Sequence, residues 1–488
     1  MSTQNRKQVL GNSIMLLHVI VIFAMLASCR PSGAESIADD TGSKSPNFIF
    51  VLVDDQGWTG TSVQMMDSDS LSMSDYHSTP NLEKLAFKGR RFSHAYSAAP
   101  VCAPSRYSIQ FAKSPARLSL IRVGMNTEHI DHYGFTSIPK ALKHVNANYR
   151  AAHFGKWGMG STPEVFGYDL SDGPTQNKEG GFVNDRSQWD HTTHEDPKQI
   201  FSLTKSATNF MEESVSRDQP FYLQVSHYAV HSSVQSRAES LADYEAKPPG
   251  TYQKNQGFAA MTKDLDNGLG IILDKVHELG IEGNTYIFYM SDNGSVPNIP
   301  GAAKYTHSYN HPLSRGKWDA MEGGVRVPLI ISGPGIASGS ESTVPVSGSD
   351  MLPTLIELCG GDPSDLLEVD GGSFTNALFG ENNEEVLRSV DGIFFHVPYR
   401  NGIALKRPHS GVRQGDYKLV KFQDNGELLL YNVVEDKGEN RNLLENQPEI
   451  ANAMEEALDN YLSDVKAPKW QEGITWKMTP LNEIGSHH

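Results

Sequence analysis

The run Asn47-Phe48-Ile49-Phe50-Val51-Leu52-Val53 is almost continuously apolar and leads directly into Asp54-Asp55-Gln56-Gly57. Such a run, rich in β-branched and aromatic residues, is typical of a strand buried on both faces of a parallel sheet. A second run, Thr285-Tyr286-Ile287-Phe288-Tyr289-Met290, has the same character and leads into Ser291-Asp292-Asn293-Gly294. The sequence therefore predicts two buried strands, each followed by a pair of polar residues and a glycine.

Other segments alternate between strand and helix patterns. Strands are predicted at 221–225 and 327–331, and helical apolar spacing runs through 202–214, 259–279 and 351–358. Thr79-Pro80-Asn81 is typical of a capped helix start with proline in the first turn. Strands that alternate with helices predict a layered α/β domain.

The last hundred residues have a different character. Strands are predicted at 390–395, 417–422 and 427–431, and the short loop between the last two favours an antiparallel meander, with a helix at about 448–465 packed on it. We place a boundary in the polar stretch 378–385, which gives a main domain of residues 47–380 and a C-terminal antiparallel subdomain of residues 381–488.

The N-terminus has the pattern of an export signal. Arg6 and Lys7 precede the short apolar stretch 14–25, and Leu26-Ala27-Ser28-Cys29 resembles a bacterial lipobox. We expect a lipoprotein signal peptide over 1–29, a lipid on Cys29, a polar tether over 30–46, and a place in the periplasm or cell envelope. An ordinary signal peptide that is cleaved nearby is the alternative, and it also predicts export.

The overall charge excludes some partners. The 488-residue chain has a net charge of −16 and a pI near 5.6, whereas nucleic-acid binding favours basic surfaces. Any site for an anion must therefore be a local cluster of lysine, arginine and histidine.

Asp54, Asp55, Asp292 and Asn293 are candidate metal ligands. Each pair follows a predicted strand, and the carboxyl ends of parallel strands meet where such sheets bind ligands. Oxygen-only ligands select Ca²⁺, or Mg²⁺ as the second choice, over zinc. The alternative is that the two pairs only cap helices or form turns.

Cys102 opens the run Cys102-Ala103-Pro104-Ser105-Arg106, which we expect to form a turn before a helix that starts near Tyr107. An exported cysteine could form a disulfide, here with Cys359, or could act as a thiolate. Three further cationic candidates are spread along the chain: Lys156, His231 and Lys317. Each alone is more often a solvated surface group, but a sulfate-like anion needs several fixed donors.

Taken in order, these motifs resemble the type I formylglycine-dependent sulfatases of the alkaline phosphatase superfamily, and the resemblance covers roughly residues 46–465. It rests on the two Asp-containing strand ends, the Cys102–Arg106 run and a set of shorter motifs. These are Thr79-Pro80-Asn81-Leu82, Gly155-Lys156-Trp157, His231, Glu322-Gly323-Gly324-Val325-Arg326-Val327-Pro328 and Gly415-Asp416-Tyr417-Lys418-Leu419.

The resemblance implies a large, mostly parallel mixed sheet flanked by helices and a smaller C-terminal domain with an antiparallel sheet. It also implies that a maturation enzyme converts Cys102 to formylglycine. Hydrated formylglycine would bind Ca²⁺ together with the four oxygen ligands named above and would attack the sulfur of a sulfate ester. Arg106 would steady the hydrate, Lys156 and Lys317 would hold sulfate oxygens, and His231 would protonate the leaving oxygen.

The chain departs from the family pattern at two places. Gly158 stands where the family usually has a histidine, so His94, His153, His307 and His311 are candidates for its role. The alternative is a water held by the metal site. Phe111-Ala112 stands where members commonly have Thr-Gly, next to an intact Cys-Pro-Arg core.

The function implied is the hydrolysis of sulfate esters on a carbohydrate met outside the cytoplasm. One alternative is a phosphomonoester or phosphonate hydrolase on the same fold. The other is a glycan-binding lipoprotein without catalytic activity, which would bind a sulfated glycan and release no sulfate.

Overall fold

The computed structural model describes residues 44–297, 299–300, 309–380, 385–400 and 407–470. The predicted signal peptide with Cys29, most of the tether and His307 lie outside the described residues. So do residues 381–384, at the boundary predicted after residue 380, and the division of the chain there stays a prediction. No helix in the described part of the chain combines the length and the hydropathy of a membrane span.

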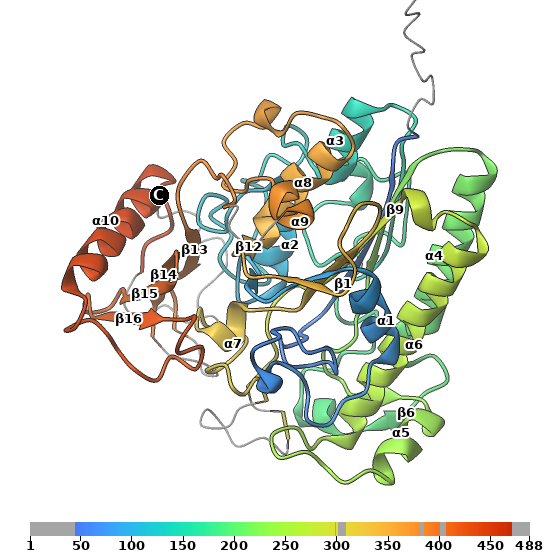
Figure 1. Cartoon of the computed structure of the whole chain (residues 1–488), viewed down its shortest axis with the longest axis horizontal. Coiled ribbons are helices and arrows are strands. Elements are labelled where there is room, and N and C mark those ends of the chain that lie inside the picture. The colour runs from blue at the N-terminus through green and yellow to red at the C-terminus, as the bar shows by residue number, and fades with distance from the viewer. Residues whose placement is uncertain (1–43, 298, 301–308, 381–384, 401–406, 471–488) are drawn as a thin grey trace, which may run out of the picture. The chain divides into compact units, whose positions relative to one another are not determined.

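The main sheet has eight strands in the order β11-β2-β10-β9-β1-β7-β4-β5 (Figure 1). β1 pairs in parallel with β9 and β7, whereas β10 is antiparallel to both of its neighbours. The predicted mostly parallel mixed sheet is thus confirmed. The strand bounds are β1 Asn47–Val53, β2 Arg90–Phe92, β4 Arg150–Gly155, β5 Leu170–Ser171, β7 Phe221–Ser226, β9 Thr285–Ser291, β10 Leu329–Ser332 and β11 Ser340–Ser342.

The side chains of β1 divide between two cores, one on each face of the sheet. Phe48, Phe50 and Leu52 join one core, and the alternating residues Ile49, Val51 and Val53 join the other. This explains why the strand is apolar at successive positions, since neither of its faces meets water.

Helices cover both faces. The core on the Ile49 side includes residues of α1 (Pro80–Lys88), α4 (Ile200–Ser216) and α6 (Gln256–Glu278). The core on the Phe48 side includes residues of α2 (Cys102–Phe111), α3 (Ile138–Val145), α8 (Met351–Leu358) and α9 (Thr375–Phe379). The smaller elements are β3 Ala95–Tyr96, β6 Thr192–Thr193, β8 Gln235–Ser236, β12 Val346–Ser347, α5 Ala238–Glu245 and α7 Glu322–Val325.

A second, antiparallel sheet contains β13 (Ile393–Val397), β14 (His409–Gln414), β15 (Tyr417–Phe422) and β16 (Leu428–Asn432). Helix α10 (Pro448–Asp464) packs on it through Met454, Leu458 and Tyr461. Figure 1 shows this sheet and α10 as a separate layer beside the main sheet.

Buried charges connect the two sheets. Lys418 of β15 lies 3.0 Å from Glu322 of α7 and 3.0 Å from Glu439, and the side chains of all three are buried. Glu322 also pairs with Arg326 at 2.7 Å. Removing one partner from such a buried set leaves an uncompensated charge, which is strongly destabilising.

The predicted helix start near Tyr107 is wrong, because α2 begins five residues earlier, at Cys102 itself. Pro104 misled the prediction: it lies in the first turn, where a missing N–H costs no helical hydrogen bond. The strand β4, which leads to Lys156, was not predicted. Cys102 and Cys359 are both free thiols, so the disulfide alternative is wrong.

Candidate active site

The two polar pairs lie side by side because Val53 and Ser291, the last residues of β1 and β9, are partners in the sheet. The backbone N–H of Asp55 donates to Asp292 Oδ1 over 3.2 Å. Ser291 joins the two loops, since its Oγ accepts from Gln56 N and donates to the carbonyl of Asn293, at 2.9 and 2.8 Å. The register of the sheet therefore brings together residues that lie more than 230 positions apart.

Oxygen and sulfur ligand atoms converge at these strand ends. Asp54, Asp55, Asp292 and Cys102 each offer one atom, and the four atoms lie within 4.8 Å of one another. Asn293 donates its amide to Asp55 Oδ1 at 2.8 Å, while its own Oδ1 is buried and has no hydrogen-bond partner in the described part of the chain. A bare buried oxygen next to three buried carboxylates fits a hard divalent cation such as Ca²⁺.

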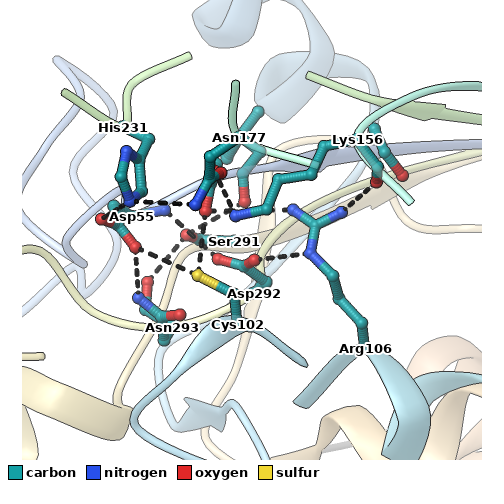
Figure 2. A network of polar contacts seen from close by, with 12 residues as sticks. Asp55, Cys102, Arg106, Lys156, Asn177, His231, Ser291, Asp292 and Asn293 are labelled. Carbon is teal, nitrogen blue, oxygen red and sulfur yellow. Dashed lines mark hydrogen bonds and ion pairs between the residues drawn. The ribbon is translucent and has the colours of Figure 1, made fainter. Parts of the chain in front are cut away.

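Cys102 is the first residue of α2, so its side chain lies at the positive end of that helix. Its Sγ lies 3.3 Å from Asp54 Oδ1, 3.7 Å from Asp55 Oδ1 and 3.3 Å from Lys317 Nζ (Figure 2). Burial, together with Asp292 and Asp54, raises the pKa of the thiol above its usual range. The unmodified cysteine is therefore a weak nucleophile, which argues against the thiolate alternative.

Three cationic side chains surround the carboxylates. Arg106 follows Cys102 by one helical turn, and its Nε donates to Asp292 Oδ2 at 2.8 Å. Lys156 donates to Asp54 Oδ2 at 2.6 Å, and Lys317 donates to both oxygens of Asp55 at 2.6 and 2.8 Å. Burial would lower the pKa of each lysine, but the paired carboxylate outweighs it and raises the pKa. Both lysines therefore stay charged at neutral pH.

His231 completes the cluster. Its Nε2 lies 3.7 Å from Asp55 Oδ2, and its Nδ1 lies 2.6 Å from the carbonyl oxygen of Ser232. That carbonyl can only accept, so Nδ1 carries a proton and Nε2 is the atom that faces the site. Burial lowers the pKa of His231 to about 4.

Two glycines let the backbone close around Lys317. A Cβ on Gly294 would lie 1.9 Å from the carbonyl oxygen of Gly323, and Gly294 N donates to Gly324 O at 2.9 Å. The neighbouring Ser295 O accepts from the backbone N–H of Lys317 at 2.9 Å. The Gly-containing motifs after β9 and in α7 thus position the lysine.

All nine residues predicted for the site lie in this one cluster, and their catalytic and metal-binding roles stay predictions. Of the candidates for the histidine absent at Gly158, the three within the described residues lie elsewhere or make other contacts. His94 is buried beside Arg326 and Arg413, His153 contacts Ser226 Oγ at 3.0 Å, and His311 stacks on Tyr252 at 3.8 Å.

The sequence analysis missed Asn177 and Lys198. Asn177 Nδ2 lies 3.5 Å from His231 Nε2, and Lys198 is buried and donates to the carbonyl of Gly180 at 3.0 Å. Asn177 belongs to a polar loop without periodicity, so no sequence signal marks it.

A mostly parallel sheet with buried carboxylates and buried cationic side chains at its strand ends defines an α/β protein with a candidate site for a metal ion and an anion. A model of the sulfatase family matches residues 46–361, so the chain belongs to the sulfatase family. A model described as "N-sulphoglucosamine sulphohydrolase, C-terminal" matches residues 317–467.

Relatives of known name agree with this assignment. The chain is 28% identical to the N-acetylgalactosamine-6-sulfatase of Mus musculus over 67% of its own length, and the match spans 65% of that relative. It is 27% identical to a sulfatase of Formosa agariphila, over 88% of this chain and 89% of that protein. The crystal structure of Ps i-CgsB in complex with k-i-k-neocarrahexaose superposes with a TM-score of 0.67 at 23% identity, covering 91% of this chain and 98% of that one.

Proposed function

We propose that the protein is a sulfatase that hydrolyses sulfate esters on a carbohydrate, through a formylglycine made from Cys102. The observation that carries the proposal is the place of Cys102, whose Sγ lies within 3.3 Å of both Asp54 Oδ1 and Lys317 Nζ. A nucleophile there is surrounded by ligands for a cation and by donors for an anion. Family membership gives independent support.

The chain's own residues supply binding and orientation. Lys156 and Lys317 are fixed charged donors for sulfate oxygens, and the bond between Arg106 and Asp292 holds the guanidinium beside the nucleophile. The negative charge of a bound sulfate ester favours a second proton on His231, at Nε2. Nε2 then donates this proton to the departing sugar oxygen, while Nδ1 stays bonded to the carbonyl of Ser232.

The metal ion and the formylglycine at residue 102 both fit the side chains that surround the site. Asp54, Asp55, Asp292, Asn293 and residue 102 would hold Ca²⁺, with Mg²⁺ as the alternative. When bound, the cation supplies positive charge next to the sulfate, and hydrated formylglycine supplies the attacking hydroxyl.

A test of the activity is a panel of sulfated and phosphorylated substrates, incubated with protein produced together with a formylglycine-generating enzyme. The names of the relatives suggest N-acetylgalactosamine 6-sulfate and carrageenan oligosaccharides as first members. We expect release of sulfate, and none from Cys102→Ala. Release of phosphate without sulfate would favour the phosphohydrolase alternative, and binding without release would favour the glycan-binding alternative.

The maturation step has its own measurement. We expect peptide mass spectrometry to find an aldehyde in place of the thiol at residue 102 in protein from the native host. A wholly unmodified cysteine there would contradict the proposed nucleophile, whichever substrate is cleaved.

We also propose that the protein is exported and anchored in the cell envelope by a lipid on Cys29. The basic, apolar and lipobox segments of residues 1–29 support this. Wild-type protein should partition into detergent and incorporate labelled fatty acid, and Cys29→Ser should do neither. Export without labelling would leave the ordinary signal peptide as the correct reading.

A further inference from the structure

Gly158 lies beside the side chains of Arg106 and Lys156 and has no side chain of its own. Its φ is +69°, and a Cβ built on it would lie 3.3 Å from Arg106 Cδ and 3.4 Å from Lys156 Cε. Any side chain at this position would therefore crowd the stems of Arg106 and Lys156. Glycine lets the backbone pass close to both.

The loop of residues 175–182 lies against this position. The backbone N–H of Gly158 donates to Thr175 O at 3.0 Å, and that of Trp157 donates to Thr175 Oγ1 at 3.0 Å. Two residues further on is Asn177, which Figure 2 shows between His231 and Lys156. The loop that contacts Gly158 therefore brings an amide side chain next to His231.

The Asn177 amide is only partly used by the protein. Its Nδ2 lies 3.5 Å from His231 Nε2, at the outer limit of a hydrogen bond, and its Oδ1 is buried without a hydrogen-bond partner among the described residues. Buried polar atoms are nearly always bonded, so the weakly bonded NH₂ group points to a missing acceptor. An anion between His231 and the lysines would supply that acceptor, whereas the unpaired Oδ1 needs a donor, which an anion does not offer.

Two residues outside the loop hold it in place. Lys198 Nζ donates to Gly180 O at 3.0 Å, and Gln199 Nε2 donates to Glu179 O at 2.6 Å. Both residues have left-handed backbone conformations, with φ of 54° and 55°. This backbone is strained for residues other than glycine, and it places the two side chains where they reach adjacent carbonyls.

Contacts inside the loop fix Asn177 further. Its carbonyl accepts from the N–H groups of Gly180 and Phe182, at 3.1 and 3.2 Å, and the Phe182 ring packs edge-on against His231 with centroids 4.8 Å apart. A donor that is already fixed before the substrate arrives costs little reorganisation during the reaction.

We propose that Asn177 is a further catalytic residue, whose side-chain NH₂ group donates to an oxygen of the sulfate ester beside His231. The amide keeps its protons throughout, so it stabilises charge and transfers nothing. Lys198 and Gln199 are positioning residues that act through the loop. This inference rests on the proposed sulfatase activity and deepens it.

The test compares Asn177→Ala and Asn177→Asp with the wild type on the panel ester that the wild type cleaves fastest. Loss of one preorganised donor should lower kcat about 100-fold while KM changes less than about threefold. The aspartate, of the same shape but with a negative charge instead of a donor, should be at least as damaging. Lys178→Ala is the matched control, because its side chain is 78% exposed in the same loop and should leave kcat within about twofold.

A value of kcat for Asn177→Ala within about fivefold of the wild type would overturn the inference. So would an equal loss in Lys178→Ala, which would show that any disturbance of the loop is enough. Lys198→Met should lower kcat in the same direction, and Lys198→Arg should restore part of it if the residue acts only by holding Gly180.

A second measurement separates this inference from the proposed function. Calorimetry with inorganic sulfate and the unmatured protein reports on the anion site without turnover. If the wild type cleaves no sulfate ester, the proposed function fails. The affinity of the variants for inorganic sulfate, compared with that of the wild type, then decides the inference about Asn177. Sulfate binding at least about fivefold weaker in Asn177→Asp supports it, whereas unchanged binding, or no binding to the wild type, overturns it.

Discussion

Asn293 uses its two amide atoms in different ways. Its Nδ2 is bonded to Asp55, which fixes the orientation of the side chain, and its Oδ1 is buried without a hydrogen-bond partner among the described residues. Leaving a buried acceptor unpaired costs about 1–3 kcal/mol. A bound cation would satisfy this oxygen.

This leads to a prediction about the metal. Asn293→Leu, of similar volume but without the oxygen, should weaken calcium binding at least tenfold, whereas Asn293→Asp should retain it because a carboxylate oxygen replaces the amide oxygen. Titration calorimetry after EDTA treatment measures both. Equal affinities in the leucine variant and the wild type, or stoichiometric zinc instead of calcium by elemental analysis, would contradict the assignment.

Gly294 gives a second prediction at this scale. A methyl group there would overlap the Gly323 carbonyl, so Gly294→Ala should separate the loop after β9 from α7 and destabilise the protein by about 3 kcal/mol or more. Urea unfolding measures the loss. Gly283→Ala is the control, because nothing lies within 4 Å of its added Cβ, and its effect should stay within about 0.5 kcal/mol.

The site residues that could be predicted from the sequence share one property. Asp54, Asp292 and Cys102 each belong to a short motif at the end of an apolar run or the start of a helix. Asn177 and Lys198 could not be predicted, because their position depends on a loop whose path is set by bonds to residues far along the chain. Local patterns do not encode such bonds.

At the scale of single elements, α1 shows how a tertiary contact replaces a local one. The predicted start at Pro80 is correct, but Thr79 makes no side-chain cap bond. Asp266 of α6 accepts from the N–H groups of Asn81 and Leu82 instead, at 3.0 and 2.8 Å. The sequence shows where this helix begins, but the group that caps it lies nearly 190 residues away.

Removing that remote cap should be measurable. Asp266→Ala leaves two N–H groups at the start of α1 without an acceptor, so we expect a loss of about 1–2 kcal/mol in the free energy of unfolding. Asp266→Asn keeps one oxygen and should lose less. If both variants unfold like the wild type in urea, water or Thr79 takes over the cap.

At the scale of the whole molecule, the apolar run of β1 was enough to predict a sheet covered on both faces. The order of its strands was not predictable, because β10 joins the sheet antiparallel between β9 and β2. Only three-dimensional packing decides that choice, since the sequence of β10 is as apolar as that of β1, which pairs in parallel with both of its neighbours.

Buried histidines predict how the whole molecule responds to acid. Burial lowers the pKa of His77, His227, His396 and His409 to about 4. Between pH 6.5 and 4 these histidines bind protons in the unfolded chain but not in the folded chain. The free energy of unfolding should therefore fall as the pH is lowered through this window. Each histidine contributes up to about 1.4 kcal/mol per pH unit.

Urea unfolding at pH 7, 6 and 5 tests this, with His227→Leu as the informative variant. Neither ring nitrogen of His227 has a hydrogen-bond partner among the described residues, so leucine should be tolerated at pH 7. The substitution should also reduce the slope of the unfolding free energy against pH, in the acid range, by the equivalent of one bound proton. An unchanged slope would show that His227 stays unprotonated in the unfolded chain or is protonated in the folded one.

The buried ion set of Glu322, Lys418 and Glu439 limits how this chain can be recombined with its relatives. Glu322 follows Lys317 by only five residues, whereas Lys418 belongs to the C-terminal sheet. A chimera joined at residue 380 would therefore combine this chain's Glu322 with a lysine and a glutamate from the other parent. One joined before Lys317 would exchange the whole set together. Shuffled libraries should therefore yield soluble, active clones mainly from the earlier junction.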